Sequence, residues 1–427
     1  MMEQRLFERT LGKTFLSLHN RNFRLFFFGQ LISNTGNWLA TVALILLVLK
    51  ITGSGFAVGL LTACQFGPIL FLSAWAGAIA DRLDKRRLIL LTQCLQMIQS
   101  IGLAILAFMP HPPLLGLYVL TTLGGILLAF DNPFRRAFVS EMVPAKEIPN
   151  AVVLYSAVVN VSRIFGPALA GLLVVTVGFG WCFTIDAVSY IAVLLGLLMM
   201  RPSELHRHLH RLPTKGGVGE GIRYIRSTPL LWISFVMLAL IGTLSYNFNV
   251  TLPLFVTDTL HSTDVVFTIL YSVFSLGAVV CALIVAHRSL VGMRHIIIGA
   301  TVLGFAMVLL ACVATVSSAM PVAFFLGMAS ILYMTSTTAL AQVEAKHEMH
   351  GRVLALQTVL VGGTTLIGGP LSGWLADTFG GRAPLLVGGM VCIFTAAFGY
   401  WATKYYLPRA IEKTEVVTGS METPDES

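Results

Sequence analysis

The chain has 427 residues, of which 56% are hydrophobic and only 11% are charged, and its mean hydropathy is +0.82. So few polar side chains cannot cover a water-soluble globule of this length, which excludes that class of protein. The net charge of +8 is spread over separate short segments, so we do not expect nucleic acid as a partner. Lipid is therefore the expected solvent for most of the chain.

Twelve apolar stretches are each long enough to cross a bilayer, because about 20 helical residues span ~30 Å of hydrocarbon. The predicted spans run near Phe23 to Leu49, Ala57 to Ala80, Leu88 to Met109, Leu114 to Phe130, Ala151 to Val177, Trp181 to Met200, Pro229 to Asn249, Val265 to Ala286, Ile296 to Val316, Met320 to Gln342, Val353 to Leu375 and Pro384 to Tyr406.

Positive charges predict how these spans are oriented. All but three of the 28 Lys and Arg residues lie before the first span, after the last one or in every second loop. Cytoplasmic loops retain positive charge, so we expect a multi-pass protein of the cytoplasmic (inner) membrane with both termini in the cytoplasm. The three exceptions are Lys50, Arg163 and Arg382.

The polar segments divide the chain into five predicted parts. Apolar residues at helical spacing among cations predict an amphipathic segment on the inner membrane face before the first span. One long polar stretch lies between spans six and seven, and its glycines (Gly216, Gly217, Gly219 and Gly221) predict a flexible middle. The parts are a cytoplasmic N-terminal segment at 1–22, a bundle at 23–200, a cytoplasmic linker at 201–228, a bundle at 229–406 and a cytoplasmic tail at 407–427.

An internal repeat relates the two halves. Gly166 and Pro167 recur 203 residues later as Gly369 and Pro370, each pair in the fifth span of its half. The sequence therefore predicts an all-α membrane protein with twelve transmembrane helices in two pseudo-symmetric six-helix bundles. Such repeats place a substrate site near the bilayer midplane, between bundles that expose it to each side in turn. The expected helix-packing motif comprises Gly166, Pro167, Gly171, Gly369, Pro370 and Gly373.

The loop between spans two and three reads Gly-Ala-Ile-Ala-Asp-Arg-Leu-Asp-Lys-Arg-Arg over residues 77–87. It resembles the loop signature of the major facilitator superfamily, with Asp84 where that family usually carries Gly. The resemblance implies a gating role, in which the cations pair with a carboxylate at the end of span four; a loop that only sets the topology is the alternative. The expected gating residues are Gly77, Asp81, Arg82, Lys85, Arg86 and the predicted acidic partner Asp131.

Further short motifs in the first half resemble one branch of that superfamily, which contains enterobactin exporters and macrolide efflux pumps. They are the segments 54–59, 130–133, 141–144 and 186–190, and the Gly-Pro pair of span five is similar to the signature of antiporters. The resemblance covers about residues 20 to 405. It implies a transporter rather than an enzyme, which exports a small amphipathic molecule, a siderophore or a drug, by proton antiport. Proton-coupled uptake and a non-transporting receptor or assembly subunit are the alternatives.

Two charged residues, Arg163 and Asp186, lie deep within predicted spans, where a charge costs ~2.5 to 3.5 kcal/mol on insertion scales. We expect both to face the central cavity, Asp186 to carry a proton, and Arg163 to hold an anion or its counter-ion. A static structural pair, or for Asp186 a polar residue near the membrane surface, is the alternative. Members of the branch usually carry Asn at position 186 and Asp at position 37, where this chain has Asn37. We therefore hypothesise that the coupling carboxylate has moved from span one to span six.

Other polar and aromatic residues are candidates for the same cavity, with interhelical hydrogen bonds as the alternative role for the asparagines. Six isolated cysteines and a solvated His-rich linker predict no metal site, and we expect no cofactor. The expected partners are a small-molecule substrate, protons and membrane lipid, with a functional monomer. The remaining cavity candidates are Asn34, Asn37, Trp38, Asn160, Tyr246, Asn247 and Asn249.

Overall fold

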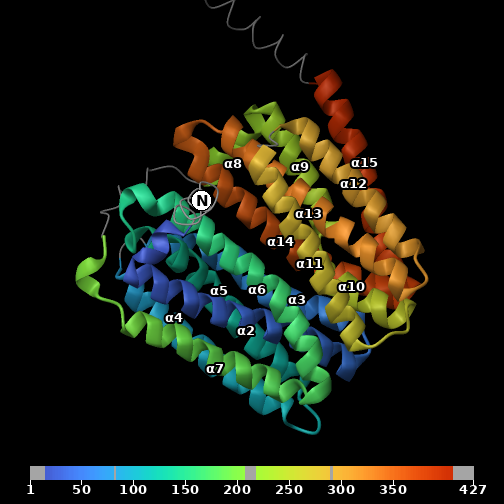
Figure 1. The fold of residues 1–427 in the computed structure, drawn as a ribbon. Coiled ribbons are helices and arrows are strands. Elements are labelled where there is room, and N and C mark those ends of the chain that lie inside the picture. The colour runs from blue at the N-terminus through green and yellow to red at the C-terminus, as the bar shows by residue number, and fades with distance from the viewer. Residues whose placement is uncertain (1–14, 81–82, 207–217, 289–291, 407–427) are drawn as a thin grey trace, which may run out of the picture.

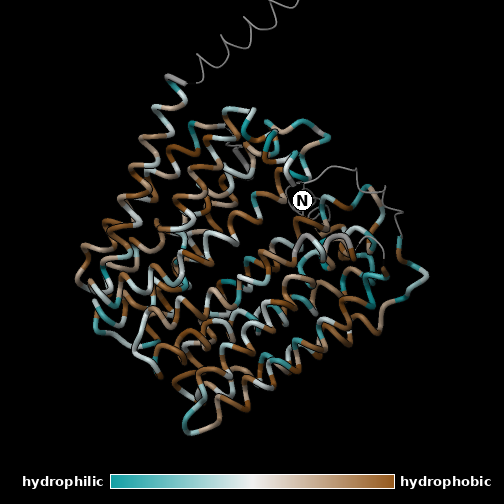
Figure 2. The backbone as a smooth tube through the Cα atoms, turned by 180° about the vertical axis from the view of Figure 1, so that it is seen from behind, coloured by the Kyte–Doolittle hydropathy of each residue, from teal (hydrophilic) through white to brown (hydrophobic). Residues whose placement is uncertain are grey.

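The computed structural model describes residues 15–80, 83–206, 218–288 and 292–406. These parts of the chain are helical, without any strand, and contain 12 helices long and apolar enough to cross a membrane (Figure 1). Figure 2 shows that hydrophobic residues occur along the whole length of most helices. The predicted all-α membrane fold with twelve spans is therefore confirmed.

Six of these spans form the first bundle, which we call the N-bundle. Its helices are α2 (Arg21–Thr52), α3 (Gly55–Ala80), α4 (Lys85–Ala107), α5 (Leu114–Glu141), α6 (Ile148–Thr176) and α7 (Phe179–Leu198).

The remaining spans form the second bundle, which we call the C-bundle. Its elements are α9 (Pro229–Leu244) and α10 (Phe248–Leu254) with the π-helical turn η4 (Phe255–Thr259), then α11 (Asp264–Arg288), α12 (Met293–Cys312), α13 (Val316–Glu344), α14 (His350–Phe379) and α15 (Ala383–Trp401) with the π-helical turn η6 (Ala402–Tyr406).

Span four is longer than predicted. The sequence predicted its end at Phe130, but α5 continues through Asp131, Pro133 and Arg135 to Glu141. The helix tolerates these polar residues because Asp131 and Arg135, one turn apart, form an ion pair inside the bundle. The charges that suggested a loop therefore belong to the span.

Span seven is discontinuous, which the sequence did not predict. Helix α9 ends at Leu244, and α10 begins only at Phe248 after a break at Ser245 to Asn247. Across the break, the backbone N–H of Tyr246 donates to the carbonyl of Ile241, five residues earlier. The span reaches Thr259 rather than the predicted Asn249, so this break lies near its middle.

The linker is partly helical, in contrast to its predicted flexible middle. Gly219 and Gly221 lie in α8 (Val218–Ser227), and Ile225 of this helix is buried against the C-bundle. The short helix η3 (Pro202–Glu204) precedes it. Residues 207–217, most of the predicted N-terminal segment and the tail at 407–427 lie outside the described residues.

The two bundles touch mainly along two helix pairs, α3 with α14 and α6 with α11, and α10 also contacts α2 and α3. At the first crossing, a Cβ at Gly59 would lie 2.3 Å from the carbonyl oxygen of Gly369, and one at Gly373 would lie 2.0 Å from that of Gly55. Only glycine permits so close an approach of two backbones. We call this end of the molecule, where α2 ends and α3 begins, the far end.

A carboxylate of the C-bundle caps a helix of the N-bundle at the far end. Asp377 of α14 accepts hydrogen bonds from the backbone N–H groups of Gly55 (2.5 Å) and Phe56 (3.0 Å) and from Oγ of Ser54 (2.7 Å). The first N–H groups of a helix have no partner within it, and their positive end attracts an anion. This cap joins the two bundles.

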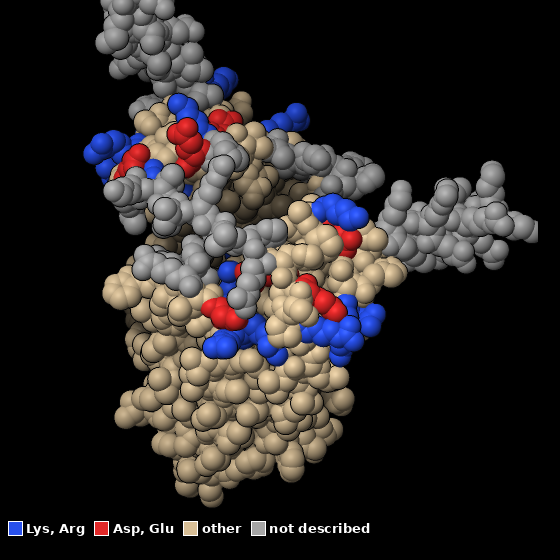
Figure 3. All heavy atoms as spheres, turned by 90° about the vertical axis from the view of Figure 1, so that its left-hand side faces the viewer, with Lys and Arg blue, Asp and Glu red and all other residues tan. Residues whose placement is uncertain are grey.

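The opposite end, where α2 begins and α15 ends, is called the charged end here. Lys, Arg, Asp and Glu gather there around a hollow between the bundles, whereas the rest of the described surface in view carries no charge (Figure 3). The bundles therefore meet at the far end and separate toward the charged end.

The Asp377 cap predicts how the far end responds to mutation. Replacing Asp377 with Ala removes three hydrogen bonds that exist only while the far end is closed. A lost helix cap costs about 1–2 kcal/mol, so the ratio of closed to open far ends should fall roughly 5- to 30-fold. Distances between spin labels at Ile51 and Thr378, in a chain without its native cysteines, would report this shift.

The matched control is Asp258→Ala, which removes an exposed carboxylate from the same end. Asp258 accepts a hydrogen bond from its neighbour Thr257 rather than from the N-bundle. If both variants gave the same distance distribution, the cap would not hold the far end closed.

Candidate functional site

A polar stripe on α2 faces the interior of the N-bundle. Gln30, Asn34, Asn37 and Thr41 follow one another at intervals of three or four residues, so they share one face of the helix. Nδ2 of Asn34 donates to Oε1 of Gln30 (3.0 Å), and Nδ2 of Asn37 donates to the hydroxyl of Tyr190 on α7 (3.4 Å). The stripe thus connects helices within one bundle.

A buried ion pair lies beside this stripe. Asp131 and Arg135 contact each other on α5, and Nη1 of Arg135 donates to Oε1 of Gln30 at 2.6 Å. Asp131 Oδ1 also accepts hydrogen bonds from Thr92 (2.6 Å) and Gln93 (3.0 Å) of α4. Both charges are compensated, so this cluster holds α2, α4 and α5 together.

Asp186 lies on α7 with 3% of its surface exposed. Its Oδ2 accepts a hydrogen bond from Oγ of Ser100 on α4 (2.8 Å), whereas Oδ1 has no hydrogen-bond partner and lies next to Gly36. Among the described residues no Lys or Arg forms an ion pair with Asp186. A carboxylate in this setting is costly to keep ionised, because neither a cation nor bulk water offsets its charge.

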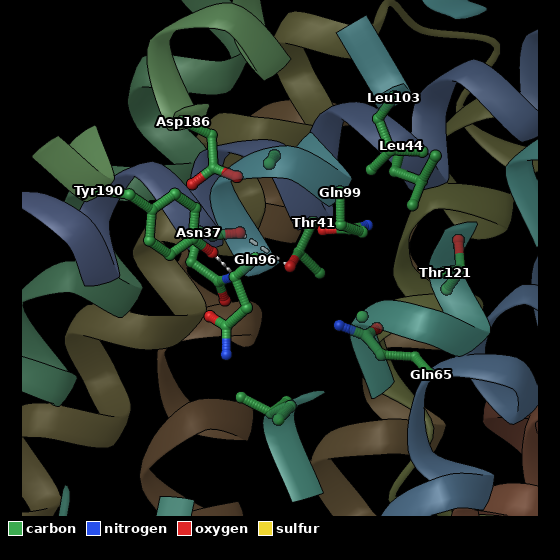
Figure 4. A pocket seen from close by; sticks show the side chains of 13 residues that line it. Asn37, Thr41, Leu44, Gln65, Gln96, Gln99, Leu103, Thr121, Asp186 and Tyr190 are labelled. Carbon is green, nitrogen blue, oxygen red and sulfur yellow. Dashed lines mark hydrogen bonds between the residues drawn. The ribbon is translucent and has the colours of Figure 1, made fainter. Parts of the chain in front are cut away.

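Asp186 borders a cavity of about 50 Å³ inside the N-bundle, which is large enough for a few water molecules. Polar side chains of α2, α3, α4, α5 and α7 surround this space, and Figure 4 shows Asn37 and Tyr190 beside Asp186. Nε2 of Gln96 is buried there without a hydrogen-bond partner. The glutamines and threonines around the cavity are Thr41, Gln65, Gln96, Gln99 and Thr121.

This position corrects one expectation about Asp186. The sequence predicted that it would face the central cavity between the bundles, but its side chain lines a cavity whose lining residues all belong to the N-bundle. The reason is that Asp186 occupies the face of α7 that packs on α2 and α4. Arg163 and Asp186 therefore do not form the structural pair considered as the alternative.

Arg163 lies on α6 and is half-buried. Its guanidinium carbon is 5.3 Å from the centre of the Trp38 ring on α2, a distance typical of a cation–π contact. Gly166, one turn further on, lets the two helices approach, since a Cβ there would be 2.4 Å from that of Trp38. Trp38 thus points toward α6, away from the Asn37 cavity.

Three further candidates for the substrate cavity lie in or next to the break in span seven. The hydroxyl of Tyr246 donates to the carbonyl of Ser330 on α13 (2.8 Å), and Tyr246 is within electrostatic range of Arg163 in the N-bundle. Asn247 is buried and donates to the carbonyl of Thr243. Asn249 accepts a hydrogen bond from Tyr271 of α11 (2.7 Å). Helix α10, which carries Asn249, also contacts α2 and α3 of the N-bundle.

The asparagine candidates are thus occupied by hydrogen bonds. Asn160 and Asn247 donate to backbone carbonyls of their own span, whereas Asn34, Asn37 and Asn249 bond to side chains of other helices or of their own. Asn34 also accepts from Arg135 at 3.4 Å. The alternative role given to the asparagines from sequence, interhelical hydrogen bonding, accounts for the contacts of Asn34, Asn37 and Asn249 but not for those of Asn160 and Asn247.

The ion pair predicted for the loop at 77–87 is wrong in its acidic partner. Lys85 pairs with Glu141 at 2.7 Å rather than with the predicted partner Asp131, because α5 extends to Glu141 and brings that carboxylate to the start of α4. Arg86 donates to backbone carbonyls at the end of α7, and Asp84 accepts from the N–H of Arg87 as the helix cap. These contacts all lie within the N-bundle.

Of the remaining residues predicted to take part in gating, only one belongs to the described part of the chain. Gly77 lies within α3, and Asp81 and Arg82 lie outside the described residues.

The Gly-Pro segments lie at helix contacts. Gly171 of α6 faces Thr268 of α11, and Gly369 and Gly373 of α14 face α3, so these three positions lie between the bundles. Gly166 packs on α2 within the N-bundle. Pro167 and Pro370 lie inside α6 and α14, and neither interrupts its helix.

Several polar residues of these clusters were missed from sequence. Arg135 and Glu141 were assigned to a loop because span four was ended too early, although the spacing of Asp131 and Arg135 is that of a helical ion pair. Asp377 lies just beyond the predicted end of span eleven, and nothing in its sequence context indicated a partner in the other half. Gln65, Gln96 and Gln99 were passed over as single polar residues in apolar runs.

The sequence also matches a known protein family. Residues 13–423 match the profile of a family described as "Transmembrane secretion effector".

Several curated proteins are similar in sequence. The multidrug efflux pump Tap of Mycolicibacterium fortuitum is 25% identical over 389 residues, which cover 87% of this chain and 94% of that protein. The staphyloferrin A transporter of Staphylococcus aureus is 27% identical over 61% of this chain and 66% of its own length. The enterobactin exporter EntS of Shigella flexneri is 28% identical over 49% and 51%. The match spans about half to two thirds of the last two relatives.

Solved structures share the fold. A bacterial homologue of the human lysosomal transporter Spinster superposes with a TM-score of 0.73 at 14% identity, covering 91% of this chain and 97% of that one. A POT family transporter in complex with 5-aminolevulinic acid gives 0.73 at 14% identity, covering 92% and 97%. At such low identity the likeness concerns the fold alone.

The Lys85–Glu141 pair generates a stability prediction. Both side chains are less than 10% exposed, so Glu141→Gln leaves a buried ammonium without its counter-charge. Breaking one partner of such a pair costs about 3–5 kcal/mol, whereas the double change Lys85→Met with Glu141→Leu should recover most of the loss. Thermal unfolding of the purified protein in detergent would measure both.

The control for this prediction is Glu204→Gln. Glu204 pairs with Arg201 at 2.9 Å, but both side chains are largely exposed, so its loss should cost less than about 1 kcal/mol. Equal losses in Glu141→Gln and Glu204→Gln would contradict a stabilising role for the buried pair.

Proposed function

Because the chain belongs to the transmembrane secretion effector family, we propose that it is a secondary active transporter that exports a small amphipathic molecule by proton antiport. Its relatives are transporters of the major facilitator type rather than enzymes. The observation that carries the proposal is the arrangement of the bundles, which are in contact at the far end and apart around a hollow at the charged end. This is one of the two states that alternating access requires.

We place the charged end in the cytoplasm and the protein in the cytoplasmic membrane. The excess of Lys and Arg in the segments at this end supports the orientation, because such segments resist translocation. Both termini and the linker at 201–228 then lie on the cytoplasmic side, and the hollow is open to molecules inside the cell. The opposite state would require the glycine contacts and the Asp377 cap to open.

Export is the proposed direction, with a siderophore or a drug as the cargo. The names of two relatives, an enterobactin exporter and a multidrug efflux pump, support it. A single chain contains both bundles and the hollow between them, which supports a functional monomer. Trp38, Arg163 and Tyr246 are the residues we assign to the substrate, since Arg163 contacts Trp38 and Tyr246 of the C-bundle is within electrostatic range of Arg163.

Asp186 is the residue we propose for proton binding. It is buried without a cationic partner, has one unpartnered carboxylate oxygen, and borders a polar cavity through which water can deliver a proton. Its coupling to the substrate would be indirect, because α7 packs on α2, which carries Trp38. Asp131 is a poorer candidate, because Arg135 compensates its charge.

Substrate-triggered proton movement in proteoliposomes tests this assignment. Catecholate and carboxylate siderophores, macrolides and organic cations would be offered to the wild type and to Asp186→Asn. An amide cannot take up and release a proton, so we expect the variant to lose proton movement, by roughly tenfold or more.

The control is Asp258→Asn, which alters an exposed carboxylate of the C-bundle and should retain the wild-type signal. Wild-type proton movement in Asp186→Asn would assign the proton to another group. The absence of proton movement for every compound in the wild type would argue against proton antiport itself.

A further inference from the structure

Arg163 and Trp38 lie at the same depth in the membrane. Arg163 is near the middle of α6 (Ile148–Thr176), and Trp38 is near the middle of α2 (Arg21–Thr52). The guanidinium carbon of Arg163 lies 5.3 Å from the centre of the Trp38 ring, and Tyr246, in the break of span seven, is within electrostatic range of the same charge. Arg163 and Trp38 thus meet at mid-depth in the N-bundle, and Tyr246 lies near the middle of a span of the C-bundle.

The guanidinium has no counter-charge. Among the described residues no carboxylate lies within ion-pair distance of Arg163, and Arg163 donates no hydrogen bond; its Nε is buried without an acceptor. The other cations inside the N-bundle differ, because Arg135 pairs with Asp131 and Lys85 pairs with Glu141. A guanidinium offers five N–H donors, and leaving them unsatisfied away from water is costly.

We propose that Arg163 binds an anionic group of the transported molecule, and that this molecule is an aromatic carboxylate. The inference rests on the proposed transport function and specifies its substrate class. The planar guanidinium matches the two oxygens of a carboxylate, and the substrate ring would lie against Trp38 and Tyr246. The half-buried position of Arg163 leaves part of the side chain open to a ligand.

This assignment discriminates among cargoes. An organic cation would be repelled by the uncompensated charge, and a neutral compound would leave the guanidinium without an acceptor in a medium of low dielectric constant. Arg163→Lys would keep the charge but lose the planar pair of donors, so it should bind the anion less well than Arg and better than Gln.

Binding to the purified protein in lipid nanodiscs tests the proposal without any proton gradient. The probes are salicylate and salicylamide, which differ in whether the ring carries a carboxylate or a neutral amide, and tetraphenylphosphonium as the cation. Isothermal titration calorimetry on the wild type should show salicylate binding roughly tenfold or more tightly than salicylamide. Arg163→Gln should abolish this preference, and Arg163→Lys should restore part of it.

Three results would overturn the proposal: equal affinity for the two aromatic probes in the wild type, tighter binding of the cation, or no binding of salicylate at millimolar concentration. If Arg163 served only to pack on Trp38, its variants would unfold at lower temperature while their ratio of salicylate to salicylamide affinity stayed that of the wild type. The binding measurement keeps Asp186 in place, is made at one pH and uses no proton gradient, so a failure of proton antiport and a failure of anion recognition give separate results.

Discussion

The low dielectric constant of the membrane interior is the constraint on which the structure depends. Polar groups turned into a bundle must be satisfied by other protein groups, and the N-bundle meets this requirement with a network in which Gln30 and Asn34 join the Asp131–Arg135 pair. Asp186 and Arg163, which lie deep within their spans, depart from this rule, because neither has a charged partner among the described residues. Exceptions of this kind mark the positions where a proton or a ligand can complete the structure.

The two bundles divide their roles unequally. The buried ionisable Lys, Arg, Asp and Glu of the described residues belong to the N-bundle, whereas the C-bundle contributes the broken span and the glycines of α14 that approach α3. The repeat seen in the Gly-Pro pairs therefore concerns how the helices pack, and it does not extend to the buried ionisable residues. Close contact of α3 with α14 requires glycines but no charge, so this packing could survive while the ionisable groups of the halves diverged.

The sequence sufficed for the twelve spans because length and hydropathy determine which segments can cross a membrane. It failed at span four, where Asp131 and Arg135 neutralise each other only once they are one turn apart inside a helix, and at span seven, where a break needs no proline or glycine at Ser245 to Asn247. Arg163 and Asp186 were recognised as deep charges, but the face of α7 that carries Asp186 depends on packing between helices. Asp377 was missed since its partners are more than 300 residues away.

The solitary charge of Arg163 also has an electrical consequence. A cation that moves with the N-bundle along the membrane normal does work against the membrane potential, about 2.3 kcal/mol per 100 mV for a full crossing. A bound monoanion cancels the charge of Arg163, so the loaded carrier would have a net negative charge from deprotonated Asp186, and the empty, protonated carrier would have the net positive charge of Arg163. Both reorientation steps would then respond to the membrane potential, and a potential that is negative inside the cell would favour each of them.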